Sequence, residues 1–390
     1  MHFIKYIIKK IGVFYVNKIL ISREQILKNN KFNVKILRKK TVVKLYESSF
    51  INSKSQYSNE NDRIKVSPFY LFRFYDVSLI GPYGIPITRN GRIITEKTQQ
   101  TTHKYILRTI SYMGIMKFVK NYLSVFLPFK RYNVKSGFHL VPRHGYSADN
   151  PNYCHWLLED LPQLFGYKTL EKNVLIITNK TQKRFQKESF ELLGISNDNI
   201  YCHDNNITRV KSLFFSNMRT AQSIKSERDP TGRRWVSNQL KNNLIKVKSN
   251  ELKSGVFISR QDLNHKYFEN MTEIEKVLKK YNIEIYYAGK KSLEDDIKKF
   301  ERINMIIAPR GAGLSNMIFT LEGCHIIEIG CYTIWQKDFF YLLAKDFNYT
   351  FDAVKANLGE KSKPNAESWF LNPRLLEEAI LRSPRFNKKK

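Results

Sequence analysis

The chain has 390 residues, 42% hydrophobic and 13% aromatic, which predicts two domains and excludes a globally disordered protein. Lysine and arginine total 66 against 35 acidic residues, and the resulting net charge of +31 predicts polyanionic partners. Nucleic acid, anionic lipid headgroups and nucleotide diphosphates are all polyanions that such a charge could bind, and charge alone does not distinguish them. The four cysteines lack metal-binding spacing and are few for an exported protein of this size, so we expect reduced thiols and a cytoplasmic location.

Residues 1–65 are predicted to form a basic N-terminal extension. Lysines interrupt every apolar run in residues 1–20, so this segment does not match an export signal, and no run of about 20 apolar residues predicts a transmembrane helix. As a helix, residues 1–20 place isoleucines on one face with lysines off it. That pattern fits peripheral contact with an anionic membrane at its inner face, or packing on the protein's own surface.

Residues 66–240 are predicted to form a first Rossmann-like domain. An aromatic, strand-rich segment starts near residue 68, and its glycines predict turns and a small β element. A helix follows at residues 152–161, and we expect Pro162 to bend or end it early. Strands and helices then alternate, which is typical of a parallel sheet covered on both faces.

Residues 241–345 are predicted to form a second Rossmann-like domain with a β-α-β-α-β-α-β series and a doubly wound sheet. Thr272 and Glu275 have the spacing of a capping box that opens one helix, and Ser292 is placed to cap the next. A further helix is expected from the glycine-rich loop to Gly323. Residues 346–390 form a helical C-terminal tail in this interpretation.

The glycine-rich loop is the predicted nucleotide site, because ligands of open α/β sheets bind where strands end and helices begin. Gly311 and Gly313 allow an anion to approach the backbone, and the amides of the helix start carry partial positive charge. Arg310 adds a guanidinium, and Ser315 and Asn316 add donors. The alternative is a tight turn with glycines selected for packing. The loop residues are Arg310, Gly311, Ala312, Gly313, Leu314, Ser315 and Asn316.

Two strand-end residues extend this site. Glu328 lies in the strand HIIEIG, where its carboxylate can accept hydrogen bonds from both hydroxyls of a ribose. Arg260 ends the strand GVFISR and is expected to reach the same diphosphate. The alternative for Glu328 is an ordinary surface acid at a strand end.

His155 and Glu159 form a second constellation, because residues four apart share a helix face. A carboxylate beside a histidine can remove a proton from a hydroxyl at neutral pH. The alternative is a capping acid near a structural histidine. Asp160 follows directly, so the identity of the base stays open between the two carboxylates, although Glu159 shares the face of His155.

The chain resembles glycosyltransferase family 61 over roughly residues 135–335. Three motifs carry the resemblance, in this order: NYCHWLLEDLPQL, ISRQDLNHKYFEN and APRGAGLSNMIFTLEGCHIIEIG. The resemblance implies a GT-B fold, in which two Rossmann-like domains face a cleft, and inverting transfer from a nucleotide sugar, expected to be UDP-linked. It implies no essential metal and no further cofactor, and the chain has no Asp-x-Asp pair. The family's functional residues fall on His155, Glu159, Arg260, the loop from Gly311 to Asn316, and Glu328.

One position departs from the family pattern: Arg310 stands where a histidine commonly precedes Gly-Ala-Gly. Arginine suits a phosphate but does not exchange protons near neutral pH. Our interpretation is an enzyme, a hexosyl- or pentosyltransferase that moves a sugar onto a glycan or lipid-linked glycan for surface polysaccharide such as capsule. The alternatives are a catalytically inactive relative and a basic protein that binds nucleic acid or membrane. Donor sugar, acceptor, linkage and oligomeric state are not defined by the sequence.

Overall fold

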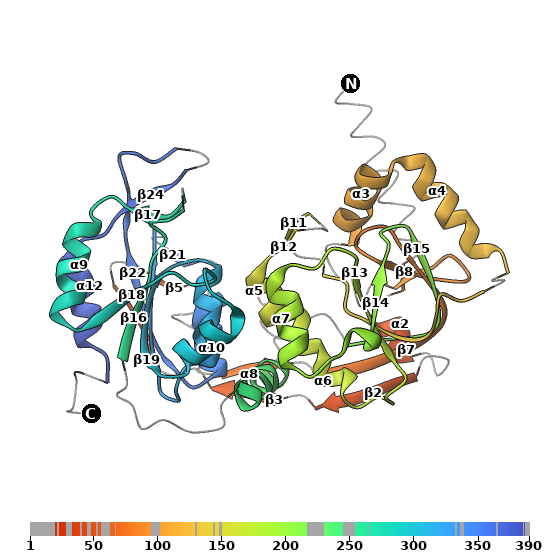
Figure 1. Ribbon diagram of the computed structural model, residues 1–390, viewed down its shortest axis with the longest axis horizontal. Coiled ribbons are helices and arrows are strands. Elements are labelled where there is room, and N and C mark those ends of the chain that lie inside the picture. The colour runs from red at the N-terminus through yellow and green to blue at the C-terminus, as the bar shows by residue number, and fades with distance from the viewer. Residues whose placement is uncertain are drawn as a thin grey trace. The chain divides into compact units, whose positions relative to one another are not determined.

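The computed structural model describes residues 20–21, 23–28, 33–39, 41–44, 48–51, 54–55, 63–66, 68–94, 102–128, 131–142, 145–147, 150–216, 230–244, 254–263, 265–331, 334–335, 339–363, 366–384 and 386. The chain divides into two compact units, residues 1–40 with 67–219 and residues 41–66 with 220–390 (Figure 1). Both combine sheets with helices, which confirms the α/β class. Residues 41–66, assigned by sequence to the N-terminal extension, group with the second unit. The amphipathic pattern of residues 1–20 lies almost wholly outside the described residues.

The first unit is built on a nine-stranded mixed sheet in the order β1-β9-β8-β7-β15-β10-β13-β14, with β2 beside β7. Strands β15, β10, β13 and β14 run parallel, whereas β7 pairs antiparallel with β15, β8 and β2. The strands are β1 (Leu20–Ile21), β2 (Asn33–Arg38), β7 (Phe69–Ile80), β8 (Ile85–Thr88), β9 (Ile93–Ile94), β10 (Val134–His139), β13 (Leu175–Asn179), β14 (Ile200–His203) and β15 (Ile207–Ser216).

The aromatic segment after residue 68 is more central than expected. It forms the long strand β7 inside this sheet, and not a separate small β element. Phe72 and Phe74 of β7 pack on Phe215 of β15, and all three side chains are buried. The helices of the unit are α2 (Arg23–Lys28), α3 (Thr102–Met113), α4 (Ile115–Leu123), η3 (Ser124–Phe126), α5 (Tyr153–His155), η4 (Trp156–Asp160), η5 (Leu161–Gln163), α6 (Leu164–Tyr167), α7 (Arg184–Leu192) and η6 (Asn197–Asn199).

The second unit is built on a six-stranded, all-parallel sheet in the order β18-β16-β19-β20-β22-β4. The strands are β16 (Ser254–Ile258), β18 (Ile283–Tyr286), β19 (Ile303–Pro309), β20 (His325–Gly330), β22 (Thr350–Lys355) and β4 (Ser48–Ile51). The predicted alternation of strands and helices is confirmed here. Counted from β16, the order is 2-1-3-4-5, so the direction of winding reverses between β16 and β19. In such sheets ligands bind beyond the strand ends at that switch point.

The helices of the second unit are α8 (Pro230–Leu244), α9 (Met271–Lys280), α10 (Leu293–Phe300), η8 (Ala312–Phe319), α11 (Phe339–Asp346) and α12 (Pro373–Leu381). Ser292 caps α10 as predicted, since its hydroxyl accepts from the amide of Asp295. The capping box at Thr272 is wrong, because α9 already begins at Met271. The glycine-rich loop leads into a 3-10 helix that ends at Phe319, short of the predicted Gly323.

The remaining strands form small sheets. They are β3 (Thr41–Lys44) with β6 (Arg63–Val66), β5 (Lys54–Ser55) with β21 (Ile334–Trp335), β11 (Gly145–Ser147) with β12 (Asn150–Pro151), and β24 (Ser368–Phe370) between β17 (Tyr267–Phe268) and β23 (Asn357–Leu358). Among the described residues, no helix has the length and apolar character needed to cross a bilayer.

Candidate active site

A cavity of about 300 Å³ opens at the switch point of the second unit. Its walls come from the ends of β16 and β19, from the loop after β18 and from the start of η8. The lining mixes apolar side chains, including Ile258, Leu263 and Leu314, with the polar side chains of Ser259, Arg260, Asp262 and Lys290. A larger cavity of about 400 Å³ shares Asp262 and Lys290 with it. The first cavity has the size and mixed lining of a small-molecule site.

Both glycines of the loop let neighbouring side chains lie close to the loop backbone. A Cβ atom on Gly311 would come within 2.3 Å of the Arg260 guanidinium, and one on Gly313 within 3.1 Å of the Ile258 side chain. Arg260 is itself held by a hydrogen bond from its Nε to the carbonyl of His265, at 3.0 Å. The structure therefore places Arg260 directly against the glycine-rich loop, as the sequence prediction required.

Arg310 and Glu328 contact each other, an interaction that the sequence did not suggest. The Arg310 guanidinium lies 2.9 Å from a Glu328 carboxylate oxygen, and the two side chains are 14% and 0% exposed. The expectation that Glu328 lies at an open strand end is wrong, because it is enclosed inside β20. A buried carboxylate needs such a partner, since leaving it uncompensated costs several kcal/mol, on the order of 3–5.

The last residues of the loop face the protein interior. Leu314, Ser315 and Asn316 are fully buried, and the Asn316 side chain donates to the carbonyl of Gly313 at 3.1 Å. The Ser315 hydroxyl has no hydrogen-bond partner among the described residues. The side chains of Ser315 and Asn316 therefore support the turn from behind, whereas Gly311, Ala312 and Gly313 remain partly exposed.

Lys266 is a third cation at this site, and the sequence analysis missed it. Its ammonium lies 3.5 Å from the carbonyl of Arg310, and its backbone is left-handed with φ of 62°. Burial lowers the pKa of Lys266, and nearby Arg260 and Arg310 lower it further against the opposing effect of Glu367 and Glu328. A left-handed lysine is uncommon and marks stored backbone strain, which clusters at functional sites. The motif ISRQDLNHKYFEN contains this lysine, but neither its left-handed backbone nor the charges around it can be read from that motif.

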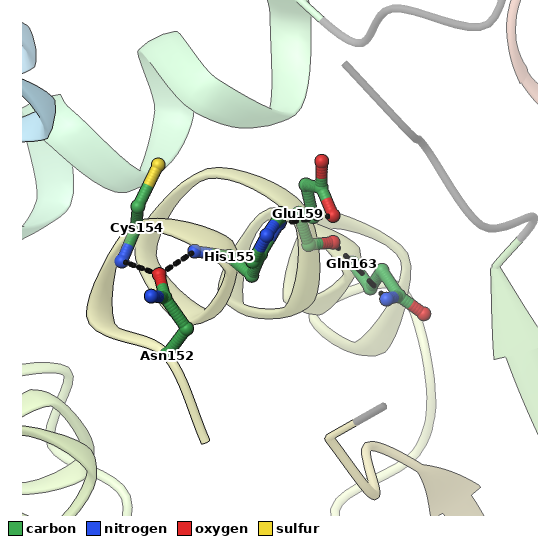
Figure 2. Close-up of polar contacts among 5 residues, drawn as sticks. All are labelled: Asn152, Cys154, His155, Glu159 and Gln163. Atoms are coloured by element: carbon green, nitrogen blue, oxygen red, sulfur yellow. Dashed lines mark hydrogen bonds and ion pairs between the residues drawn. The ribbon is translucent and has the colours of Figure 1, made fainter. Parts of the chain in front are cut away.

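In the first unit, a short irregular helix positions His155 and Glu159 (Figure 2). The Asn152 side chain caps it by accepting from the amides of Cys154 and His155. The chain then passes from the α turn α5 through the π turn η4 and the 3-10 turn η5 into α6. Pro162 lacks an amide hydrogen, and the 3-10 turn accommodates it, so the helix continues beyond the predicted end. Single π turns frequently occur at functional sites.

His155 and Glu159 form the predicted pair. Nδ1 of His155 lies 3.0 Å from a Glu159 carboxylate oxygen, and the two side chains are 20% and 1% exposed (Figure 2). Burial opposes protonation of the imidazole, but the charge and hydrogen bond of Glu159 and the charge of Asp160 outweigh it and raise the pKa of His155. Gln163 donates to the carbonyl of Glu159 at 3.1 Å and so holds the turn. The imidazole is the more accessible member of the pair.

Residues 153–327 match the family model described as Glycosyltransferase 61. Over these residues the chain is similar to glycosyltransferase family 61. Comparison with curated proteins gives no match. The family implies a glycosyltransferase, with a sugar donor and an acceptor as substrates. The matched segment begins at α5, which carries His155, and ends inside β20, one residue before Glu328.

The family 61 segment thus spans parts of both units. His155, Glu159 and Asp160 lie in the first unit, whereas Arg260, Lys266 and the glycine-rich loop lie in the second. Within the described ranges, no group of three or more His, Cys, Asp or Glu side chains is arranged to hold a metal ion.

Proposed function

We propose that this chain transfers a sugar, with inversion, from a nucleotide-sugar donor to a hydroxyl of a glycan or lipid-linked glycan. The observation that carries the proposal is the cavity at the switch point of the second unit, which Arg260 and the glycine-rich loop line. Lys266 lies against the same loop, 3.5 Å from the carbonyl of Arg310. We further propose a GT-B architecture in which the second unit is the Rossmann-like nucleotide domain and the first unit is the acceptor-side domain. The match of residues 153–327 to the Glycosyltransferase 61 model supports the reaction class.

In the donor site, the apolar lining suits the base and ribose of a nucleotide, and the partly exposed glycines allow the diphosphate to approach the loop. Arg260 and Lys266 supply positive charge at the position where the leaving diphosphate gains negative charge. Such preorganised charge stabilises the departing group. Arg310 contributes less to this step, because its guanidinium is already paired with Glu328.

In the acceptor site, His155 and Glu159 act together as the base. Glu159 is almost fully buried, so the partly exposed imidazole is the group within reach of an acceptor hydroxyl. Glu159 orients the ring and stabilises the imidazolium that forms when the hydroxyl proton is taken up. Asp160 adds negative charge nearby, and does not share the 3.0 Å contact that Glu159 makes with His155. The activated oxygen then attacks the anomeric carbon from the face opposite the diphosphate.

We place the reaction at the cytoplasmic face of a membrane, in the assembly of a surface polysaccharide such as capsule. The basic N-terminal sequence and the net charge of +31 support this context. No metal is assigned a role, because the cations of the second unit supply the charge that the leaving group needs.

Binding of nucleoside diphosphates and nucleotide sugars to the intact protein tests the donor site. A ligand that binds only the folded state raises the melting temperature by mass action. Ala288 lines the cavity and is half-buried, so Ala288→Phe should fill the cavity and abolish the shift. Ala366→Phe is the matched control, since Ala366 is also half-buried and does not line the cavity. Ligand-induced stabilisation that survives in Ala288→Phe would place the nucleotide elsewhere.

A further inference from the structure

The outer face of α4 exposes a continuous row of large apolar side chains. Ile115, Met116, Val119 and Leu123 are between 41% and 80% exposed. At about 100° per residue, these positions fall within roughly 100° of the helix circumference, so they form one stripe. Phe126 and Leu127 continue it beyond the helix and are 49% and 60% exposed. A soluble protein rarely leaves such a row uncovered without a function.

The inner face of α4 fixes the direction in which this stripe points. Val125 in η3, directly after α4, is fully buried in the core beside β7, β8 and β9. The Tyr122 hydroxyl donates to the carbonyl of Gly91 at 2.8 Å, and the Asn121 amide donates to Asn206 at 2.8 Å. Because the helix is held from one side by packing and hydrogen bonds, the apolar stripe is a fixed feature of the first unit. Figure 1 shows α3 and α4 at the margin of that unit, away from β13 and β14.

The surrounding charge identifies the chemistry of the occupant. Residues 97–148 contain nine Lys and Arg residues and no Asp or Glu. On α4, Lys120 lies about 40° from the edge of the stripe and Lys117 about 100° from it, and both are exposed. Neither forms an ion pair within the described part of the chain. An apolar face flanked by lysines is the pattern of helices that lie in the headgroup region of an anionic bilayer. Protein interfaces, in contrast, are depleted in lysine.

We propose that the α4 stripe docks this protein on an anionic bilayer, with Ile115, Met116 and Leu123 in the acyl boundary and Lys117 and Lys120 at the phosphates. Long lysine side chains can extend from the apolar layer to the headgroups. The inference does not depend on the proposed transfer reaction, since it uses only the surface of the first unit. It supplies a membrane contact separate from the amphipathic pattern of residues 1–20.

Flotation of the intact protein with vesicles tests the docking surface. We compare phosphatidylcholine vesicles with vesicles that also contain phosphatidylglycerol. The double variant Met116→Ser/Leu123→Ser should bind anionic vesicles at least about tenfold more weakly than the wild type, because two apolar side chains no longer enter the bilayer. Leu358→Ser is the control, since Leu358 is 63% exposed in β23 of the second unit. Equal binding by the double variant and the wild type would overturn the proposal.

A charge variant separates local docking from the attraction of a strongly basic protein to any anionic surface. Lys117→Gln/Lys120→Gln should weaken binding roughly fivefold for each lysine removed. The matched control is Lys276→Gln/Lys279→Gln, which removes the same charge at the same spacing from exposed positions on α9. If both pairs weaken binding equally, net charge alone explains the association and the proposal fails.

Fluorescence quenching by brominated lipids measures how deeply a residue of α4 enters the bilayer. Tryptophan at position 116, in Met116→Trp, should be quenched by brominated lipids more strongly than tryptophan at position 358 in Leu358→Trp. Equal quenching would place α4 outside the bilayer and contradict the proposal. A wild-type dimer in solution that Met116→Ser/Leu123→Ser converts to monomer would show that the stripe binds a second copy of the chain, which also overturns it.

Discussion

Replacing Arg310 by methionine removes the guanidinium that pairs with the buried carboxylate of Glu328. The two groups are 2.9 Å apart, and Glu328 is 0% exposed while Arg310 is 14% exposed. Removing one partner of a buried pair costs about 3–5 kcal/mol. Because Arg310 retains some contact with solvent, we expect the lower end, about 3 kcal/mol, which corresponds to roughly a hundredfold change in an equilibrium constant.

Hydrogen exchange of the β19 and β20 amides measures this loss inside the second unit, without assuming that both units unfold together. Arg382→Met is the control, because Arg382 and Glu378 form a 2.6 Å pair of which each side chain is 47% exposed. Such surface pairs contribute about 0.5 kcal/mol. The two substitutions should not be additive, because both remove the same ion pair. The stability lost by Arg310→Met/Glu328→Gln should be smaller than the sum of the losses in the two single variants, by at least about 1 kcal/mol.

The competing account assigns Arg310 chiefly to the donor phosphate. It predicts that Arg310→Met weakens nucleotide binding and leaves the exchange of β19 and β20 as little changed as in the Arg382 control. That outcome would refute the structural role of the ion pair.

Three further predictions follow from buried or crowded groups. The raised pKa of His155 means that its contribution to the free energy of unfolding is complete below pH 6.5 and declines as the pH rises through the higher folded-state value; urea denaturation of wild type and His155→Gln across this range should show the difference shrinking with pH, and a growing difference would contradict the sign. Arg233→Met should destabilise the second unit by about 3 kcal/mol, because Asp346 is 0% exposed and 2.9 Å away; a loss below about 0.5 kcal/mol in denaturation would show that the pair is not needed. Gly311→Ala should displace Arg260 and weaken nucleoside diphosphate binding by about 1–3 kcal/mol in calorimetry, while an unchanged affinity would remove that contact from the donor site.

The local elements of the second unit were predictable because each has its own sequence signal. The buried strands are short apolar runs, and Ser292 precedes a helix with acids in its first turn. Thr272 had the same kind of signal, but Asn270 stands before it and hydrogen-bonds the carbonyl of Leu371 and the carboxylate of Glu273. A tertiary contact 101 residues away therefore set the start of α9, and no local pattern contains it.

The candidate site was predictable in part for the same reason. Helical spacing correctly placed His155 beside Glu159, and the strand-end rule placed Arg260 at the glycine-rich loop. Arg310 follows β19 and Glu328 lies in the neighbouring strand β20, so their pairing depends on the sheet order. The pair stabilises the fold because Glu328 is fully buried, and that burial could not be read from the sequence. Lys266 was missed because its importance lies in a left-handed backbone and in charges from other segments.

The most direct test of sugar transfer is the release of nucleoside diphosphate from a panel of nucleotide sugars, measured with an acceptor glycan present. We predict release with one donor class for the wild type, and release reduced to background for Glu159→Gln while donor binding stays near normal. The rate should rise with pH as His155 loses its proton. Donor binding without release from any nucleotide sugar, or unchanged release in Glu159→Gln, would contradict the proposed reaction or the base assigned to it.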